Sequence, residues 1–403
     1  MGAVTATGAP AGAWQLTPLE LAAGLPLGHD PDLVPLAVTD DGPRAAVEAA
    51  VLGALLRPPC VVSFSGGRDS STVLALAAHV AAREGLAPPV AVTLRFPRLP
   101  ESDESEWQRQ VVDHVGVREW TLLDTTDELD LLGDDARDQI RRHGVLWPPN
   151  THFHQRIAAL AAGGSLLTGF AGDEVMSPGS PWDRLAHVQQ GQVRPRASDA
   201  ARRALAASPR AVRRAVLARR PDPTPARPWL RPHAADALRR AKVGAEAELP
   251  VRPDDALVDG WWRARYRTVA TASLARVGAD HDAVVVHPFT EPGVLSALAG
   301  AHRVRLPRSR AQALGALVGD LLPAEVLVRR SKAEFGRAFW GPGARDFAHG
   351  WDGTGVDSTL VDPDTLHTAW SADRPDGRSF ALLQHAWAAS ARAGGASADD
   401  GEQ

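Results

Sequence analysis

Cysteine is almost absent from this sequence, since Cys60 is the only one among 403 residues. A single cysteine cannot form a disulfide within the chain, and it excludes a zinc site built from several thiolates. Long hydrophobic runs are also lacking, because no stretch reaches the roughly 18 apolar residues that a membrane-spanning helix needs. Residues 1–14 contain no basic segment followed by a continuous apolar run, so they are not a secretion signal. We therefore expect a cytoplasmic protein without a membrane partner.

A strong excess of either charge is missing as well. The chain has 44 Lys and Arg against 48 Asp and Glu, a formal net charge of −4, so its overall charge does not attract nucleic acid. Hydrophobic residues make up 44% and charged residues 23%, as in ordinary soluble proteins, and the length is sufficient for a substantial core. We expect a soluble enzyme rather than a nucleic-acid-binding protein.

Strand and helix patterns alternate through the first half of the sequence. The apolar periodicity predicts, in order, a helix at 45–56, strand 60–64, helix 70–83, strand 90–96, helix 105–114, strand 119–123, helix 151–162 and strand 165–168. This alternation is typical of an α/β fold in which a parallel twisted sheet is flanked by helices.

Composition divides the chain further. Residues 1–42 are rich in Gly, Pro and Asp and are expected to form a loosely structured lead-in with one short helix at 18–23. Residues 43–390 are expected to form one domain with a mostly helical C-terminal part. Within it, the Arg- and Pro-rich stretch 183–250 reads as an insertion of helices and a mobile loop. The polar tail 391–403 is predicted to be disordered.

A glycine pair follows the first predicted strand, in the segment 64–71, Phe-Ser-Gly-Gly-Arg-Asp-Ser-Ser. Gly66 and Gly67 allow the backbone to approach an anion closely, and the N–H groups at the start of the next helix donate to it. Three hydroxyls add donors to the same anion, those of Ser65, Ser70 and Ser71. The segment therefore predicts a phosphate-binding loop, although a Gly-Gly turn capped by serines is the simpler alternative.

Asp69 is the unexpected member of this loop, because a carboxylate repels phosphate. Its presence is explained if it binds a Mg²⁺ ion that bridges to the phosphates. The loop is not of the Walker A type, since no lysine follows the second glycine at the required place.

A second strand-to-loop transition occurs at 167–174, Leu-Thr-Gly-Phe-Ala-Gly-Asp-Glu. Loops at the carboxyl ends of parallel strands meet in one crevice, so we expect Gly169 and Gly172 to lie at the nucleotide and Asp173 to complete the metal site. Glu174 is predicted to orient an amine or accept its proton, with capping of the following helix as the alternative.

The two loops together resemble those of the synthetase domain of class B asparagine synthetases, which belongs to the PP-loop ATP pyrophosphatases and is related to β-lactam synthetases and lasso-peptide cyclases. The resemblance continues over residues 45–390 at four further places: Asp103-Glu104, Trp147-Pro148-Pro149-Asn150, His287-Pro288-Phe289-Thr290-Glu291, and Arg329-Arg330-Ser331-Lys332-Ala333-Glu334-Phe335. It implies an adenine nucleotide alpha hydrolase-like fold, ATP and Mg²⁺ as cofactors, and a role for Lys332 at the α-phosphate.

The reaction implied by this resemblance is AMP-forming amide synthesis. A carboxylate attacks the α-phosphate of ATP, pyrophosphate leaves, and an amine then displaces AMP from the acyl-adenylate. The implied partners are a small-molecule or peptide carboxylate and an amine or ammonia, with a separate amine-donor or carrier protein as a further possibility.

Three departures from the family pattern alter this expectation. Position 2 is Gly rather than the cysteine that hydrolyses glutamine, and about 45 residues precede the synthetase core, so we expect no N-terminal glutaminase domain. Phe170 stands where asparagine synthetases commonly have an acid, and Thr290-Glu291 replaces Leu-Asp. These changes predict a specialised substrate instead of free aspartate, and a lasso-peptide or β-lactam-type cyclase remains an alternative.

Two other interpretations stay open. A PP-loop tRNA-modifying enzyme shares the phosphate loop, and the arginines at 202–220 would then bind RNA, although a solvated helical face is the commoner role of such a run. A non-catalytic homologue that binds nucleotide is the second. The histidines are interpreted as structural, because their spacing matches no metal motif: His152, His154, His281 and His287.

Overall fold

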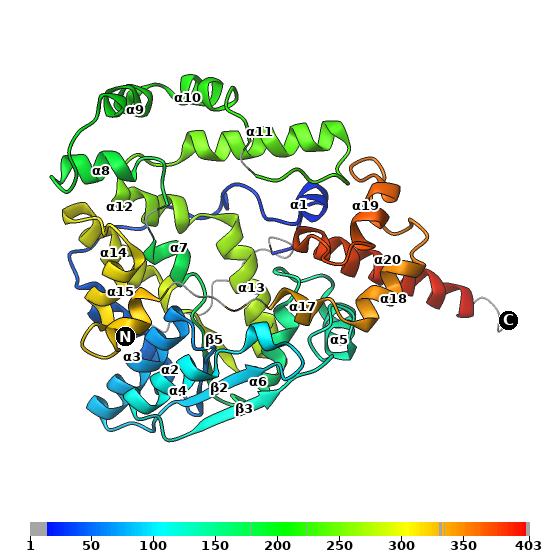
Figure 1. Cartoon of the computed structure of the whole chain (residues 1–403), viewed down its shortest axis with the longest axis horizontal. Helices are drawn as coiled ribbons and strands as arrows, with labels where there is room; N and C mark the ends of the chain where they lie inside the picture. Colours follow the sequence, from blue (N-terminus) through cyan, green and yellow to red (C-terminus); the bar gives the residue numbers. More distant parts are fainter. Residues whose placement is uncertain (1–13, 178, 223, 330–332, 334, 400–403) are drawn as a thin grey trace.

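A computed structural model describes residues 14–177, 179–222, 224–329, 333 and 335–399 (Figure 1). At its centre is a five-stranded parallel sheet in the order β3-β2-β1-β4-β5. The strands are β1 (Cys60–Ser63), β2 (Val90–Arg95), β3 (Trp120–Asp124), β4 (Ser165–Leu167) and β5 (Val284–Val286). The predicted α/β class is confirmed, and the four predicted strands agree with β1–β4 to within one or two residues. The short strand β5 was not predicted, because it lies in the part that was expected to be mostly helical.

Both faces of the central strand β1 are buried. Val62 belongs to the large core formed with α2 (Pro43–Leu55), α3 (Arg68–Glu84), α14 (Pro292–Val304) and α15 (Arg310–Val318). Val61 points the other way, into a smaller core with Ile157 of α6 (Gln155–Ala159). Burial on both faces explains why β1 is a run of apolar residues rather than an alternation of apolar and polar ones.

The strand order reverses at β1. The chain leaves β1 through α3 to β2 on one side, whereas β4 pairs with the opposite edge of β1. A crevice opens at such a switch point, at the carboxyl ends of the two strands. The loops that follow β1 and β4 lead into α3 and into the short helix α7 (Gly172–Met176), so both predicted motifs lie at this crevice.

A second core holds together the helical C-terminal part of the described chain. It is centred on the fully buried indoles of Trp229 and Trp370. Its helices are α1 (Pro18–Ala23), α5 (Asp134–His143), α11 (Pro232–Glu248), α18 (Pro342–Gly350), α19 (Pro363–Trp370) and α20 (Phe380–Asp399). Figure 1 places α18–α20, in orange and red, beside the sheet-bearing half of the molecule.

The stretch 183–250 forms helices along one edge of the molecule, drawn in green at the top of Figure 1. They are α8 (Asp183–Gln189), α9 (Ala197–Ala207), α10 (Arg210–Leu217) and α11. The other helices are α4 (Ser105–Val115), α12 (Pro253–Asp255), α13 (Arg265–Ala279), α16 (Ala324–Val328) and α17 (Gly336–Phe339). Short 3₁₀ or π segments occur at η1 (Pro100–Ser102), η2 (Thr151–His154), η3 (Ala256–Trp261), η4 (Pro288–Thr290) and η5 (Gly377–Ser379).

Two segments differ from the sequence prediction. The helix expected at 151–162 is the 3₁₀ segment η2 followed by α6, which ends at Ala159, and Gly163, with φ 75°, then turns the chain into β4. At the other end, α20 continues to Asp399, beyond residue 391, where the sequence predicted that a disordered tail begins. Four alanines in this extension favour a helix, whereas the pair Gly394-Gly395 disfavours it, so helix propensity alone does not account for the extension.

The chain just before β1 lies very close to the start of β4, and this contact predicts how a substitution there changes stability. A Cβ atom at Gly164 would lie 2.1 Å from the carbonyl oxygen of Pro59, a contact that rigid backbone cannot relieve. Gly164→Ala should therefore lower the free energy of unfolding by about 1–3 kcal/mol, the usual cost of overpacking. Thermal unfolding followed by circular dichroism measures it.

Gly53→Ala is the matched control, since Gly53 lies exposed within α2 and its Cβ would meet no atom within 4 Å. This change should raise stability by up to about 1 kcal/mol through helix propensity. Equal melting temperatures for the two variants would contradict the close approach at Gly164.

Candidate active site

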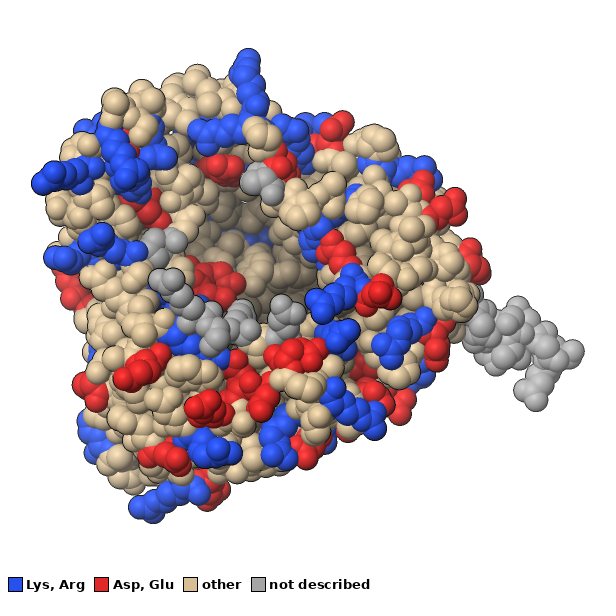
Figure 2. Space-filling model, viewed as in Figure 1, with Lys and Arg blue, Asp and Glu red and all other residues tan. Residues whose placement is uncertain are grey.

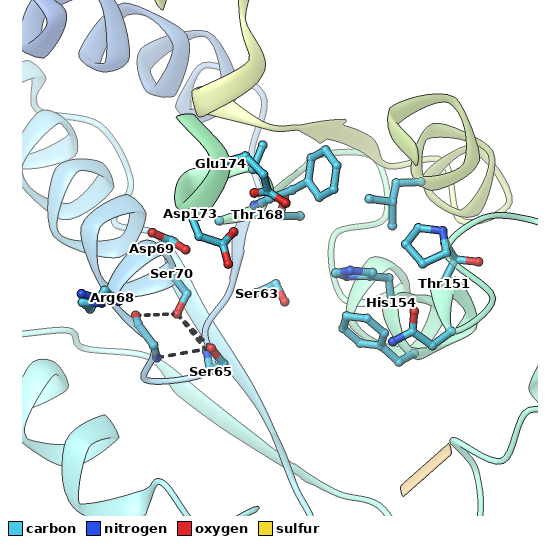
Figure 3. Close-up of a pocket in the computed structure, with 18 of the residues that line it drawn as sticks. Ser63, Ser65, Arg68, Asp69, Ser70, Thr151, His154, Thr168, Asp173 and Glu174 are labelled. Atoms are coloured by element: carbon cyan, nitrogen blue, oxygen red, sulfur yellow. Dashed lines mark hydrogen bonds between the residues drawn. The ribbon is translucent and has the colours of Figure 1, made fainter. Parts of the chain in front are cut away.

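A cavity of about 590 Å³ lies where the loops after β1 and β4 meet. Those two loops form one side of it, and the segment from Pro148 to His154 together with α13 forms the other. Figure 2 shows the molecule hollowed where Figure 1 draws α7 and α13. Figure 3 shows the labelled side chains that line this cavity.

The phosphate-loop candidate is held in shape by its own hydrogen bonds (Figure 3). The hydroxyl of Ser70 donates to the carbonyl of Gly67 at 3.1 Å and accepts from the N–H of Ser65 at 3.2 Å. The Ser65 and Ser70 hydroxyls lie 3.1 Å apart. Gly66 has φ 82°, and a Cβ there would lie 2.7 Å from Cγ of Gln108, so glycine is required for both conformation and space.

The predicted phosphate-binding residues differ in whether they line the cavity. Ser65, Gly67 and Ser70 line the cavity, and Gly67 is the N-cap of the 17-residue helix α3, whose first N–H groups have no partner within the helix. Ser71 is completely buried and does not line the cavity. The loop therefore presents two hydroxyls and a helix N-terminus, which suits an anion.

The loops after β1 and β4 are in contact. A Cβ atom at Gly172 would lie 2.4 Å from the carboxyl carbon of Asp69, and one at Gly169 would lie 2.8 Å from the backbone nitrogen of Ser70. Ala171, which precedes α7, has φ 65°, and this left-handed residue turns the second loop towards the first. The two predicted motifs, about a hundred residues apart in sequence, thus meet at one point.

Three carboxylates line this part of the cavity: Asp69, Asp173 and Glu174 (Figure 3). Burial raises the pKa of Asp69, and an ion pair with Arg310 partly offsets that effect. Burial, reinforced by the neighbouring Asp173, raises the pKa of Glu174 to about 7. Tyr266 donates a hydrogen bond from its phenol to Oε1 of Glu174 at 3.2 Å.

Mg²⁺ fits the pair Asp69 and Asp173 by its preference for carboxylate oxygens. Oδ1 of Asp69 is buried without a hydrogen-bond partner among the described residues, which is the state expected of an atom reserved for a ligand. The described chain contains no group of three or more His, Cys, Asp or Glu side chains arranged around one metal position. Further ligands would have to come from the phosphates and water, as is usual for this ion.

Two arginines in the cavity wall were not predicted as site residues. Arg310, at the start of α15, forms the ion pair with Asp69 from 241 positions further along the chain. Arg329 forms an ion pair with Glu104 and donates to the carbonyl of Gly66 at 3.0 Å, so it helps to hold the phosphate loop in place. The sequence showed Arg329 only as part of a motif and gave no signal for Arg310. Lys332 lies outside the described residues.

The predicted structural role of the histidines agrees with their surroundings. Burial lowers the pKa of His154 to about 3 and the pKa of His287 to about 4, so both are neutral. Nδ1 of His287 lies 2.6 Å from the hydroxyl of Thr168, and the ring packs against Phe170 with centroids 5.3 Å apart. Thr290 does not line the cavity; its hydroxyl donates to the carbonyl of His287 at 3.0 Å.

The switch-point crevice, the serine-glycine loop and the adjoining carboxylates define an α/β protein with a candidate anion-binding site at the carboxyl ends of its central strands. Residues 44–389 match the family model described as asparagine synthase. The chain therefore belongs to the asparagine synthase family. Its general activity is that of an ATP-dependent ligase that joins a carboxylate to an amine or ammonia. Comparison with curated proteins gave no match.

The family assignment favours the ligase over a tRNA-modifying enzyme. In the arginine-rich stretch, Arg213 is buried and donates to the carbonyl of Leu249, whereas the others are mostly exposed: Arg203, Arg210, Arg214, Arg219 and Arg220. Among the helices of the described ranges, none combines the length and apolarity needed to cross a bilayer.

Contact between the loops predicts the effect of filling position 172. Gly172→Ala should displace the Asp69 carboxylate and lower ATP-dependent turnover by about a hundredfold, because misplacement of a reacting group by about 1 Å has that effect. The steady-state rate of ATP consumption measures it. Gly293→Ala is the control, since a Cβ on this exposed residue of α14 meets nothing within 4 Å. Equal rates in the two variants would show that the contact does not matter.

Proposed function

We propose that this protein forms an amide bond through an acyl-adenylate, with release of AMP and pyrophosphate, on a specialised substrate. The observation that carries the proposal is the contact of Gly172 with Asp69, which puts the two acidic loops side by side at a helix N-terminus. An ATP-dependent ligase that activates a carboxylate needs a triphosphate site and a carboxylate-binding space in one crevice, and a cavity of about 590 Å³ adjoins these loops.

In this proposal the β- and γ-phosphates of ATP bind Ser65, Gly67, Ser70 and the N-terminus of α3. Mg²⁺ would be held by Asp69 and Asp173 and would neutralise negative charge on the phosphates. An oxygen of the substrate carboxylate then attacks the α-phosphorus, and the bond to pyrophosphate breaks. Positioning and charge stabilisation supply most of the rate enhancement in such reactions.

The second half-reaction needs an amine beside the acyl carbon. The amine nitrogen attacks that carbon and the bond to AMP breaks. Glu174 is proposed to orient the amine or accept its proton, with Tyr266 fixing the carboxyl group through the hydrogen bond described above. Lys332 is proposed to stabilise charge on the α-phosphate and on the tetrahedral intermediate, where loss of one such donor costs about 10²–10³ in rate.

The nitrogen source is proposed to be free ammonia, a separate amine-donor protein, or an amine of the substrate itself. Cys60 is a poor candidate for the nucleophile of glutamine hydrolysis, because burial in β1 raises the pKa of its thiol to about 11. An amine carried on the same peptide as the carboxylate would make the product a ring, as in the related cyclases.

The route through an adenylate can be tested by isotope transfer. A substrate carboxylate labelled with ¹⁸O should pass one labelled oxygen to AMP, because the carboxylate oxygen becomes bonded to the α-phosphorus. Mass spectrometry of the nucleotide products reads this directly. Label found in inorganic phosphate, with ADP as the nucleotide product, would instead indicate an acyl-phosphate and overturn the AMP-forming mechanism.

Asp69→Asn tests the proposed metal ligand. The amide keeps the shape that Gly172 requires but removes the charge, so pyrophosphate release should be abolished while the fold is retained. Turnover and circular dichroism spectra are measured together. Asp124→Asn is the control, an exposed carboxylate at the end of β3 that pairs with Arg95. Substantial turnover by the Asp69 variant would mean that the metal role is misassigned.

A further inference from the structure

Charge divides the cavity into two unlike halves. The ionised side chains that line it all come from the phosphate loop, the second loop, or the segments beside them: Arg68, Asp69, Glu104, Asp173, Glu174, Arg310 and Arg329. The opposite wall is formed by the stretch 148–154 and by α13, and its described lining residues are Pro148, Asn150, Thr151, Phe153, His154, Tyr266 and Leu274. Figure 3 shows His154 and Thr151 facing Asp69 and Asp173 across the open space.

The two titratable groups of this opposite wall are uncharged. Burial holds the pKa of His154 at about 3, so its imidazole is neutral in any ordinary buffer. The ring packs on Phe153 at 3.8 Å between centroids with an interplanar angle of 34°, and its Nδ1 is buried without a hydrogen-bond partner among the described residues. Burial also raises the pKa of Tyr266, so the phenol stays protonated. Among the described lining residues, this wall offers no charge to a ligand.

An aromatic surface joins the neutral wall to the reacting groups. Phe170, from the second loop, lies parallel to Tyr266 with centroids 6.2 Å apart and an interplanar angle of 9°. The ring of Trp147 meets Tyr266 edge-on at 4.8 Å, and His287 packs against Phe170. These rings support one another, so the surface is fixed before a ligand arrives. It begins at Phe170, three residues before Asp173.

A second charged group on a ligand would meet no oppositely charged side chain among the described residues of this surface. Free aspartate carries an ammonium and a second carboxylate besides the group to be activated, and burying an unpaired charge is strongly unfavourable. An apolar or aromatic group gains free energy by leaving water and by packing on the rings.

We propose that the acyl substrate is a monocarboxylic acid whose remainder is uncharged and apolar or aromatic, bound against Phe170, Tyr266, Leu274 and His154. Its carboxylate points towards the phosphate loop. The acyl role rests on the proposed function, whereas the preference for a neutral apolar acid follows from the walls of the cavity.

Matched acids test this preference. We would compare 4-methylbenzoate with terephthalate, and hexanoate with adipate, each pair differing by a second carboxylate at the far end, with aspartate as a further ligand. Affinities come from isothermal titration calorimetry on the full chain with Mg²⁺ and a non-hydrolysable ATP analogue. Pyrophosphate release from ATP is measured on the same acids with hydroxylamine as the amine. The monoacid of each pair should bind at least about tenfold more tightly.

A charge placed in the wall should change this selectivity. Phe170→Arg puts a guanidinium beside the aromatic surface. In this variant the monoacid of each pair should bind no more tightly than the diacid. Phe170→Leu is the matched control, which keeps the wall apolar and should preserve the preference for the monoacid. Because Phe170 is only partly buried, both variants should fold, as circular dichroism will check.

The outcomes separate the two proposals. Binding of aspartate or the diacids as tightly as the monoacids, or binding of none of the acids, overturns the substrate inference, whatever the enzyme does with ATP. A clear preference for monoacids without any pyrophosphate release supports the binding site but contradicts the acyl-adenylate function. Unchanged selectivity in Phe170→Arg overturns the assignment of the wall.

Discussion

Contact between a glycine and a carboxylate is the constraint on which this site depends. There is no room for a side chain between position 172 and Asp69. Because residue 172 is glycine, the loop after β4 can lie directly on the loop after β1. The parallel sheet makes this possible by ending both strands at the same edge, and the left-handed Ala171 supplies the turn. If either loop moved, the two acidic residues would no longer face a common space at the start of α3.

Local patterns predicted much of this arrangement. Strands β1–β4, α3 and the two glycine-containing loops follow from short apolar runs and from backbone requirements that can be recognised in the sequence, as at Gly66. The side-chain partners of the site residues were not predicted. Arg310 pairs with Asp69 across 241 positions and from outside every motif, and Tyr266 reaches Glu174 from the first turn of α13. Such partnerships depend on tertiary packing, which periodicity does not encode.

Burial explains the finer disagreements between sequence and structure. Ser71 has the right chemistry for phosphate, but the helical turn at the start of α3 directs it into the protein, where it is completely buried. Phe170 is an apolar residue in a polar loop, and the structure shows that it packs against the rings of Tyr266 and His287; the altered substrate that it predicts stays a prediction. The identity and spacing of the residues therefore indicated which positions are candidates for the site, whereas the direction of each side chain is set by the fold.

Arg310 gives the carboxylate of Asp69 a built-in counter-ion. While its guanidinium is paired with Asp69, the buried carboxylate is already neutralised, so a dissolved divalent cation would have to compete with an attached one. Under the proposed function, a bound triphosphate would change that balance, since it would give the arginine another anion to contact and would bring the metal with it. Metal and nucleotide would then enter as a single complex, and the protein would not accumulate metal alone.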